Sequence, residues 1–170
     1  MHYYLLDPQG LSLADFERKQ ASLLALTHEF NISGEVGRLS TIRSIEDLVY
    51  AAEKRQVSTL VVCGTDDTFN RVLGALGKRR FVIGFVPLTE DSQIAKLLGI
   101  DSLASAVKVL AARRITLVDT AKIGTLDFFS YLEFGVVDDL FGKKSWLNIF
   151  SQKKIHIIAR INNQYLVSGE

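Results

Sequence analysis

Residues 59–70 read Thr-Leu-Val-Val-Cys-Gly-Thr-Asp-Asp-Thr-Phe-Asn, an apolar and β-branched run that stops at a glycine and four polar residues. Uninterrupted apolar strands are typical of parallel sheets, because both faces of such sheets are covered. Residues 81–86, Phe-Val-Ile-Gly-Phe-Val, repeat the pattern and end at Pro87. A helix-forming stretch separates the two runs, so the sequence predicts two buried strands of a parallel sheet.

The same alternation extends toward the N-terminus. Strands are expected at 2–6 and 34–39. Helices with capping residues are expected at 16–31, 44–55, 68–76, 93–98 and 102–113. Strands and helices that alternate at this spacing predict an α/β fold with a doubly wound parallel sheet.

The alternation ends near Arg114, and the remaining chain is rich in strand signals. Strands are expected at 115–118, 126–137 and 155–161, with a short helix at 140–150. Asn162-Asn163 reads as a hairpin turn before a strand at 165–167. We therefore expect an α/β nucleotide-binding-like domain at 1–113 and a short antiparallel β unit at 114–170, as a truncated second domain.

The composition excludes several classes of protein. The 170 residues carry 20 basic and 19 acidic side chains and a formal charge of +1, which gives no basic stripe for nucleic acid. Cys63 is the only cysteine and is expected to be a buried apolar residue. No stretch is long enough for a transmembrane segment and no secretory signal is visible, so a cytoplasmic location is expected. The three histidines lack metal-ligand spacing, so no zinc site is expected.

Two loops have the character of a ligand site. One follows the strand at 59–63 and the other, Pro87-Leu88-Thr89-Glu90-Asp91-Ser92, follows the strand at 81–86. Ligands of open parallel sheets bind at the carboxyl ends of the strands, and helix N-termini there favour phosphate. A simpler interpretation is that Asp66 and Ser92 only cap helices.

These loops carry a resemblance to the diacylglycerol kinase family. Residues 62–72, Val-Cys-Gly-Thr-Asp-Asp-Thr-Phe-Asn-Arg-Val, resemble the family's Gly-Gly-Asp-Gly-Thr-x-Asn-Glu-Val. Residues 83–96 resemble its Gly-x-x-Pro-Leu-Gly-Thr-Gly-Asn-Asp-Phe-Ala-Arg, and 7–10 stand where the family has an Asn-Pro-x-Ser-Gly turn. The motifs occur in order over residues 2–135.

The resemblance implies a nucleotide site and a lipid substrate. In the family, ATP lies between the two loops and a phosphoryl group passes to a lipid hydroxyl, which implies ATP and Mg²⁺ as cofactors. Carried over by position, the cofactor-binding residues would be Gly10, Thr41, Gly64, Thr65, Asp66, Thr68, Asn70 and Thr89. The catalytic base of the family lies late in its second domain, and no residue here matches it, so the catalytic residue is unassigned.

The departures from the family pattern lie in the same loops. Thr65 and Asp67 replace glycines that would allow close backbone approach to phosphate. Glu90 and Asp91 add carboxylates to the second loop, and like charges ~4 Å apart cost about 4 kcal/mol at an effective dielectric near 20. We therefore expect a degenerate ATP-binding site with weak or no phosphotransfer.

Two alternatives remain open. The chain is an active ATP-dependent lipid kinase with divergent loops, or it is a non-catalytic dimerisation or partner-binding module. The second alternative predicts a homo-oligomer formed through residues 115–170, because unpaired strand edges are normally covered.

Overall fold

The computed structural model describes residues 1–123, 126–129, 157–161 and 164–168. The chain divides into two compact units, Met1–Leu132 and Glu133–Glu170. Within the part that the structure describes, no helix has both the length and the apolar character needed to cross a membrane.

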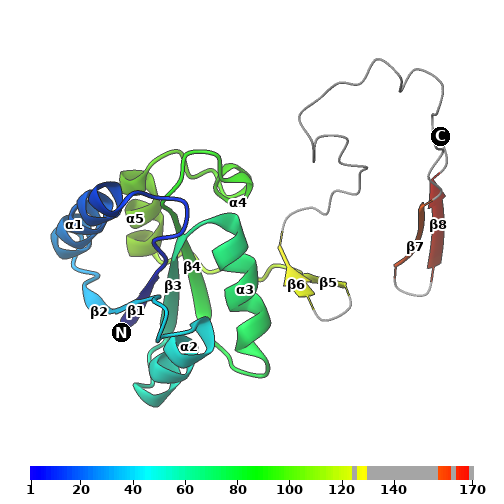
Figure 1. Ribbon diagram of the computed structural model, residues 1–170, viewed down its shortest axis with the longest axis horizontal. Helices are drawn as coiled ribbons and strands as arrows, with labels where there is room; N and C mark the ends of the chain where they lie inside the picture. Colours follow the sequence, from blue (N-terminus) through cyan, green and yellow to red (C-terminus); the bar gives the residue numbers. More distant parts are fainter. Residues whose placement is uncertain (124–125, 130–156, 162–163, 169–170) are drawn as a thin grey trace. The chain divides into compact units, whose positions relative to one another are not determined.

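A four-stranded parallel sheet with the order β2-β1-β3-β4 forms the centre of the first unit (Figure 1). Its strands are β1 (His2–Leu6), β2 (Gly34–Arg38), β3 (Thr59–Gly64) and β4 (Val82–Pro87). The connecting helices are α1 (Leu13–Glu29), α2 (Ile45–Lys54), α3 (Asp66–Leu76), α4 (Gln93–Leu97) and α5 (Leu103–Ala112). Helices α1 and α5 pack together on one face of the sheet, and α2 and α3 on the other. The predicted α/β fold with a doubly wound parallel sheet is confirmed.

Burial explains why these segments form strands and helices. All six residues of β3 are buried, as its apolar sequence predicts for a central strand covered on both faces. Cys63 is fully buried within it, which confirms its predicted place in the core. Ser44 begins α2 with a reciprocal capping box to Asp47, and Ser12 and Ser102 cap α1 and α5.

The segment after α5 differs from the prediction. Residues 115–118 were expected to form a strand, but they are irregular and pair with no described strand. Leu117 is 98% exposed, so β-branched and apolar residues alone did not create a strand here. Strand formation depends on a pairing partner and on burial more than on intrinsic preference.

Short antiparallel pairs follow. Strand β5 (Ala121–Ile123) pairs with β6 (Leu126–Phe128). Of the predicted strand at 126–137, residue 129 lies beyond β6, and residues 130–137 lie outside the described residues, as does the predicted helix at 140–150. In the second unit β7 (Ile157–Ile161) pairs with β8 (Gln164–Ser168), which confirms the predicted antiparallel pairing across Asn162-Asn163. The predicted domain boundary at 113/114 stays a prediction.

Candidate functional site

Three loops meet at the carboxyl ends of β1, β3 and β4. Gly10, in the turn after β1, has a φ of +80°, a conformation that side chains disfavour. A methyl group built on Gly10 would lie 3.6 Å from Cγ2 of Thr89 and 3.8 Å from Cγ2 of Thr65. The structure therefore brings together one predicted site residue from each loop.

A buried hydrogen-bond network joins the first two loops. The hydroxyl of Thr68 donates to Oδ2 of Asp7 at 2.7 Å, and the amide of Gln9 donates to Oδ1 of Asp7 at 2.9 Å. Thr65 caps α3 through a reciprocal capping box with Thr68. Gly64 lies beside this network, because a methyl group there would lie 2.9 Å from the Thr68 hydroxyl. Both carboxylate oxygens of Asp7 thus already accept hydrogen bonds.

Asp66 links the loop after β3 to the helix after β4. Its Oδ2 accepts from the amides of Gln93 at 2.7 Å and Ile94 at 3.2 Å, and its Oδ1 accepts from the hydroxyl of Ser92. Ser92 also caps α4 by accepting from the amide of Ala95 at 2.9 Å. The side chain of Asp66 therefore occupies the N-terminus of α4, which is where helix amides favour an anion.

The helix-cap interpretation of Asp66 and Ser92 is therefore partly right. Ser92 caps its own helix, as expected. Thr65, and not Asp66, caps α3. Asp66 instead accepts hydrogen bonds at the start of α4, where its partner Gln93 lies 27 residues further along the sequence. Local sequence could not reveal this long-range partner.

The other acidic residues of the two loops point to solvent. The side chain of Asp67 is 61% exposed and forms an ion pair with Arg71 at 3.7 Å. Glu90 and Asp91 are exposed. The side chains nearest to Gly10 are the methyl groups of Thr65 and Thr89, and Glu90 lines a cavity beside the second loop.

Two predicted site residues lie apart from this cluster. Thr41 is exposed in the turn between Ser40 and Arg43, after β2. Asn70 accepts a hydrogen bond through Oδ1 from the amide of Phe129 at 3.0 Å, so it ties α3 to the chain that follows β6. The described contacts give neither residue a partner among Gly10, Thr65 and Thr89.

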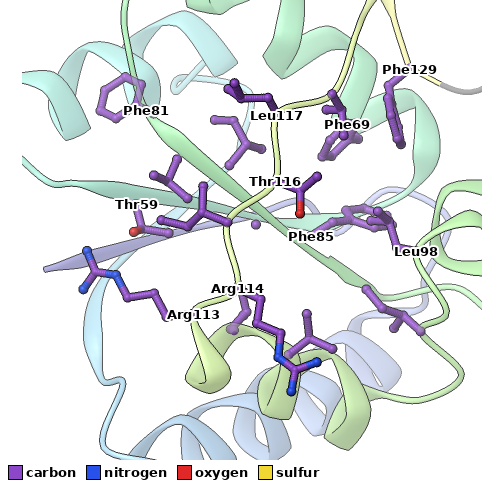
Figure 2. A pocket seen from close by; sticks show the side chains of 18 of the residues that line it. Thr59, Phe69, Phe81, Phe85, Leu98, Arg113, Arg114, Thr116, Leu117 and Phe129 are labelled. Carbon is purple, nitrogen blue, oxygen red and sulfur yellow. The ribbon is translucent and has the colours of Figure 1, made fainter.

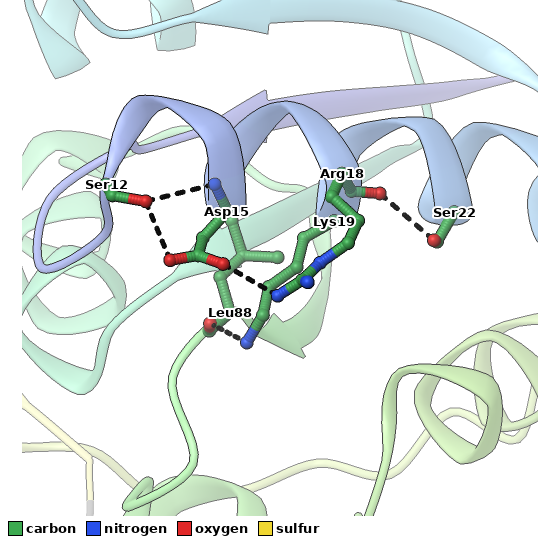
Figure 3. A network of polar contacts seen from close by, with 6 residues as sticks. All are labelled: Ser12, Asp15, Arg18, Lys19, Ser22 and Leu88. Atoms are coloured by element: carbon green, nitrogen blue, oxygen red, sulfur yellow. Dashed lines mark hydrogen bonds and ion pairs between the residues drawn. The ribbon is translucent and has the colours of Figure 1, made fainter.

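Lys19, on α1, forms a hydrogen bond with the second loop (Figure 3). Its Nζ donates to the carbonyl oxygen of Leu88 at 2.7 Å, across 69 residues of sequence. A cavity of about 340 Å³ lies beside this contact and is lined in part by Lys19, Thr89, Ser92 and Lys96. Neither Lys19 nor Asp7 was predicted as a site residue. The Asp7-Pro8-Gln9-Gly10 turn was a signal for Asp7, whereas nothing in the sequence around Lys19 marked it.

Carboxylates at this edge offer little to a divalent cation. Mg²⁺ binds oxygen ligands in octahedral geometry. Asp7 and Asp66 both use their oxygens within the protein, and no group of three or more acidic, histidine or cysteine side chains that could hold a metal occurs within residues 1–123 or the other described segments.

Comparison with known proteins places this fold. A solved structure of a diacylglycerol kinase from Bacillus anthracis str. Sterne superposes with a TM-score of 0.61 at 16% sequence identity, covering 75% of this chain and 45% of that one. A putative diacylglycerol kinase from the same organism gives a TM-score of 0.61 and 16% identity, covering 75% of this chain and 46% of that one. The chain thus spans less than half the length of either structure.

The sequence comparison identifies the family. The family profile of the diacylglycerol kinase catalytic domain matches residues 13–123. The chain belongs to the diacylglycerol kinase catalytic domain family, as its motifs had suggested. No curated protein gives a significant match.

Proposed function

We propose that this protein is a lipid-kinase-like protein that binds phosphate groups of a nucleotide weakly and transfers them slowly or not at all. One observation carries the proposal: Thr65, which stands where the family pattern has a glycine, places its methyl group beside Gly10, and the methyl group of Thr89 lies next to the same glycine. A nucleotide phosphate that approached the first amides of α3 would meet these methyl groups. A glycine at position 65 would instead allow the backbone to come close to the phosphate.

A reduced phosphate site remains at the N-terminus of α3. Thr65 accepts from the amides of Thr68 and Phe69, through its hydroxyl and its carbonyl oxygen respectively. The amides of Asp66 and Asp67 precede these two and have no partner among the described residues. Amides in the first turn of a helix favour phosphate oxygens.

ATP and Mg²⁺ are the cofactors that the family implies, and the residues present fit them poorly. Gly10, Gly64 and the first amides of α3 would face the phosphates, while Thr65 and Thr89 narrow the space through their methyl groups. Bound ATP would supply the phosphoryl group for a lipid hydroxyl. In the chain itself, Asp66 holds the two loops together and Thr68 holds the turn after β1.

Calorimetric titration with ADP and ATP, with and without Mg²⁺, tests the binding half of the proposal. We expect dissociation constants of about a millimolar or weaker, since a few amide contacts alone support about 4 kcal/mol. A lipid phosphorylation assay with ATP and diacylglycerol in detergent micelles tests the other half. Tight nucleotide binding together with robust lipid phosphate formation would support the alternative of an active kinase and contradict the proposal.

The second candidate function is a non-catalytic interaction module. The observation that favours it is the exposed apolar segment after α5, where Ile115 is 58%, Leu117 98% and Val118 57% exposed. Exposed apolar side chains that lie next to one another mark interaction surfaces. Under this alternative, light scattering would show a homo-oligomer that Leu117→Asp dissociates, and nucleotides would give no thermal shift.

A further inference from the structure

The open edge of the parallel sheet carries a groove that takes no part in the nucleotide site proposed above. Strand β4 ends the strand order, and a groove of about 510 Å³ runs along it. Its walls come from α3, α5 and the segment 113–118, which Figure 2 shows crossing in front of the sheet. Pockets for small ligands have volumes of ~300–1,000 Å³, so the groove is large enough for one.

The groove is apolar along most of its length. The ring of Phe69 contacts that of Phe85 with centroids 5.1 Å apart and that of Phe129 with centroids 6.0 Å apart. Leu98, at the same end of the groove, is 41% exposed. Ile115 and Leu117 line the groove from the segment 113–118. An apolar occupant would remove these side chains from water.

The opposite end of the groove is cationic. Arg113 extends toward the side where Thr59 lies, away from Phe69 and Phe129 (Figure 2). Among the described residues that line the groove none is acidic, and Arg113 has no acidic partner in that part of the chain. His2 also lines this end, and burial lowers its pKa, with a further lowering by the positive charges of the N-terminal amino group and Arg113.

We propose that this groove binds a fatty acid, with the carboxylate beside Arg113 and Thr59 and the acyl chain along β4 toward Phe69 and Phe129. The guanidinium of Arg113, which has no acidic partner within the described residues, supplies the charge that complements a carboxylate, and the apolar walls complement the chain. The segment 113–118 crosses in front of β4 and forms one wall of the groove (Figure 2), so a slender, flexible chain enters beside it, whereas the strand of a second copy would have to push it aside.

The length of the acyl chain gives the first test. Calorimetric titration of the full chain with octanoate, decanoate and laurate, each below its critical micelle concentration, should show affinity rising about fourfold per added methylene until the groove is filled. Dodecanol, which lacks the charge, should bind about tenfold more weakly than laurate. Absence of binding, or affinity independent of chain length, would overturn the proposal.

Arg113 gives the second test with little risk to the fold. It has a φ of +48°, a left-handed conformation at the end of α5 where glycine is preferred. Arg113→Gly should therefore unfold no more easily than the native protein while losing laurate affinity about tenfold or more. Arg113→Lys should retain most of the affinity, and Arg43→Gln, in the exposed turn after β2, should leave it unchanged.

The third test concerns the far end of the groove. Leu98→Asp places a carboxylate beside the expected tail and should weaken laurate more than octanoate. Equal laurate affinity in Arg113→Gly and the native protein would overturn the proposal. So would light scattering that shows a dimer dissociated by Leu98→Asp, because a second copy would then occupy the groove. These measurements use no nucleotide, so failure of the nucleotide proposal would not affect them.

Discussion

The hydroxyl of Thr68 lies 2.7 Å from Oδ2 of Asp7, and both residues are buried. Asp7 directly follows β1 and Thr68 lies in the first turn of α3, so one hydrogen bond fixes the turn after β1 against the loop after β3. Buried polar groups of this kind are costly to leave unpaired, which makes the pair sensitive to small changes around it.

Gly64→Ala should disrupt this pair. The added methyl group would lie 2.9 Å from the Thr68 hydroxyl and 3.1 Å from Cβ of Asp7, so one of them must shift. We expect a loss of ~1–3 kcal/mol in the free energy of unfolding, measured by urea denaturation. Gly74→Ala is the matched control: its methyl group meets nothing within 4 Å, and alanine in a helix should stabilise by ~0.5–1 kcal/mol. Equal effects at the two positions would contradict the packing argument.

Asp66 and Asp67 are adjacent acids with different partners. Asp66→Ala removes the acceptor for Ser92 and for two amides of α4, and should lower the free energy of unfolding by ~1–3 kcal/mol. Asp67→Ala removes one exposed ion pair with Arg71 and should change stability by less than ~0.5 kcal/mol. Chemical denaturation of the two variants side by side checks the difference, and a large effect at Asp67 would sink this assignment.

Thr65→Gly should strengthen nucleotide binding. The substitution removes a methyl group that faces Gly10, and glycine at a helix N-cap costs only a few tenths of a kcal/mol. We expect ADP affinity to rise roughly tenfold, which corresponds to ~1.4 kcal/mol. Calorimetry against the native chain measures this, and Ser58→Ala, at an exposed residue just before β3 and therefore at the end of that strand opposite Gly64, serves as the control. No gain in Thr65→Gly would mean that methyl crowding does not limit the site.

His2 predicts a dependence of stability on pH. Burial lowers its pKa below the ordinary value of 6.5, and the charge of Arg113 adds to the shift. The unfolded state therefore binds more protons between the folded pKa and 6.5, so stability should fall as pH is lowered through this window and level off below it. NMR titration should give a His2 pKa below 6.5 that rises in Arg113→Gly. A His2 pKa at or above 6.5 would contradict the prediction.

The sheet could be predicted from the sequence because its central strands are continuous runs of mostly apolar, β-branched residues. Leu60 to Cys63 is apolar throughout, and all of Thr59 to Cys63 is buried. The loops that meet at its end were likewise predicted, since turn residues and helix caps are local features. Gly10, Thr65 and Thr89 do lie together, whereas Thr41 and Asn70 lie apart from them.

Long-range contacts account for what the sequence did not reveal. Asp66 finds its partners at Ser92 and Gln93, and Lys19 finds its partner at Leu88. Such pairs depend on how loops approach one another in space, which no local pattern encodes. The missed irregular segment at 115–118 has the same origin, because a strand requires a neighbour and none is present among the described strands.

The contact between Asp66 and Ser92 couples the loop after β3 to the loop after β4. Neither loop can swing outward alone without stripping a carboxylate and two amides of their partners at once. Movement of one loop is therefore coupled to movement of the other. A substitution at residue 66 changes which side chains at residue 92 can form a hydrogen bond with it. Among relatives that keep this arrangement, the two positions are expected to covary.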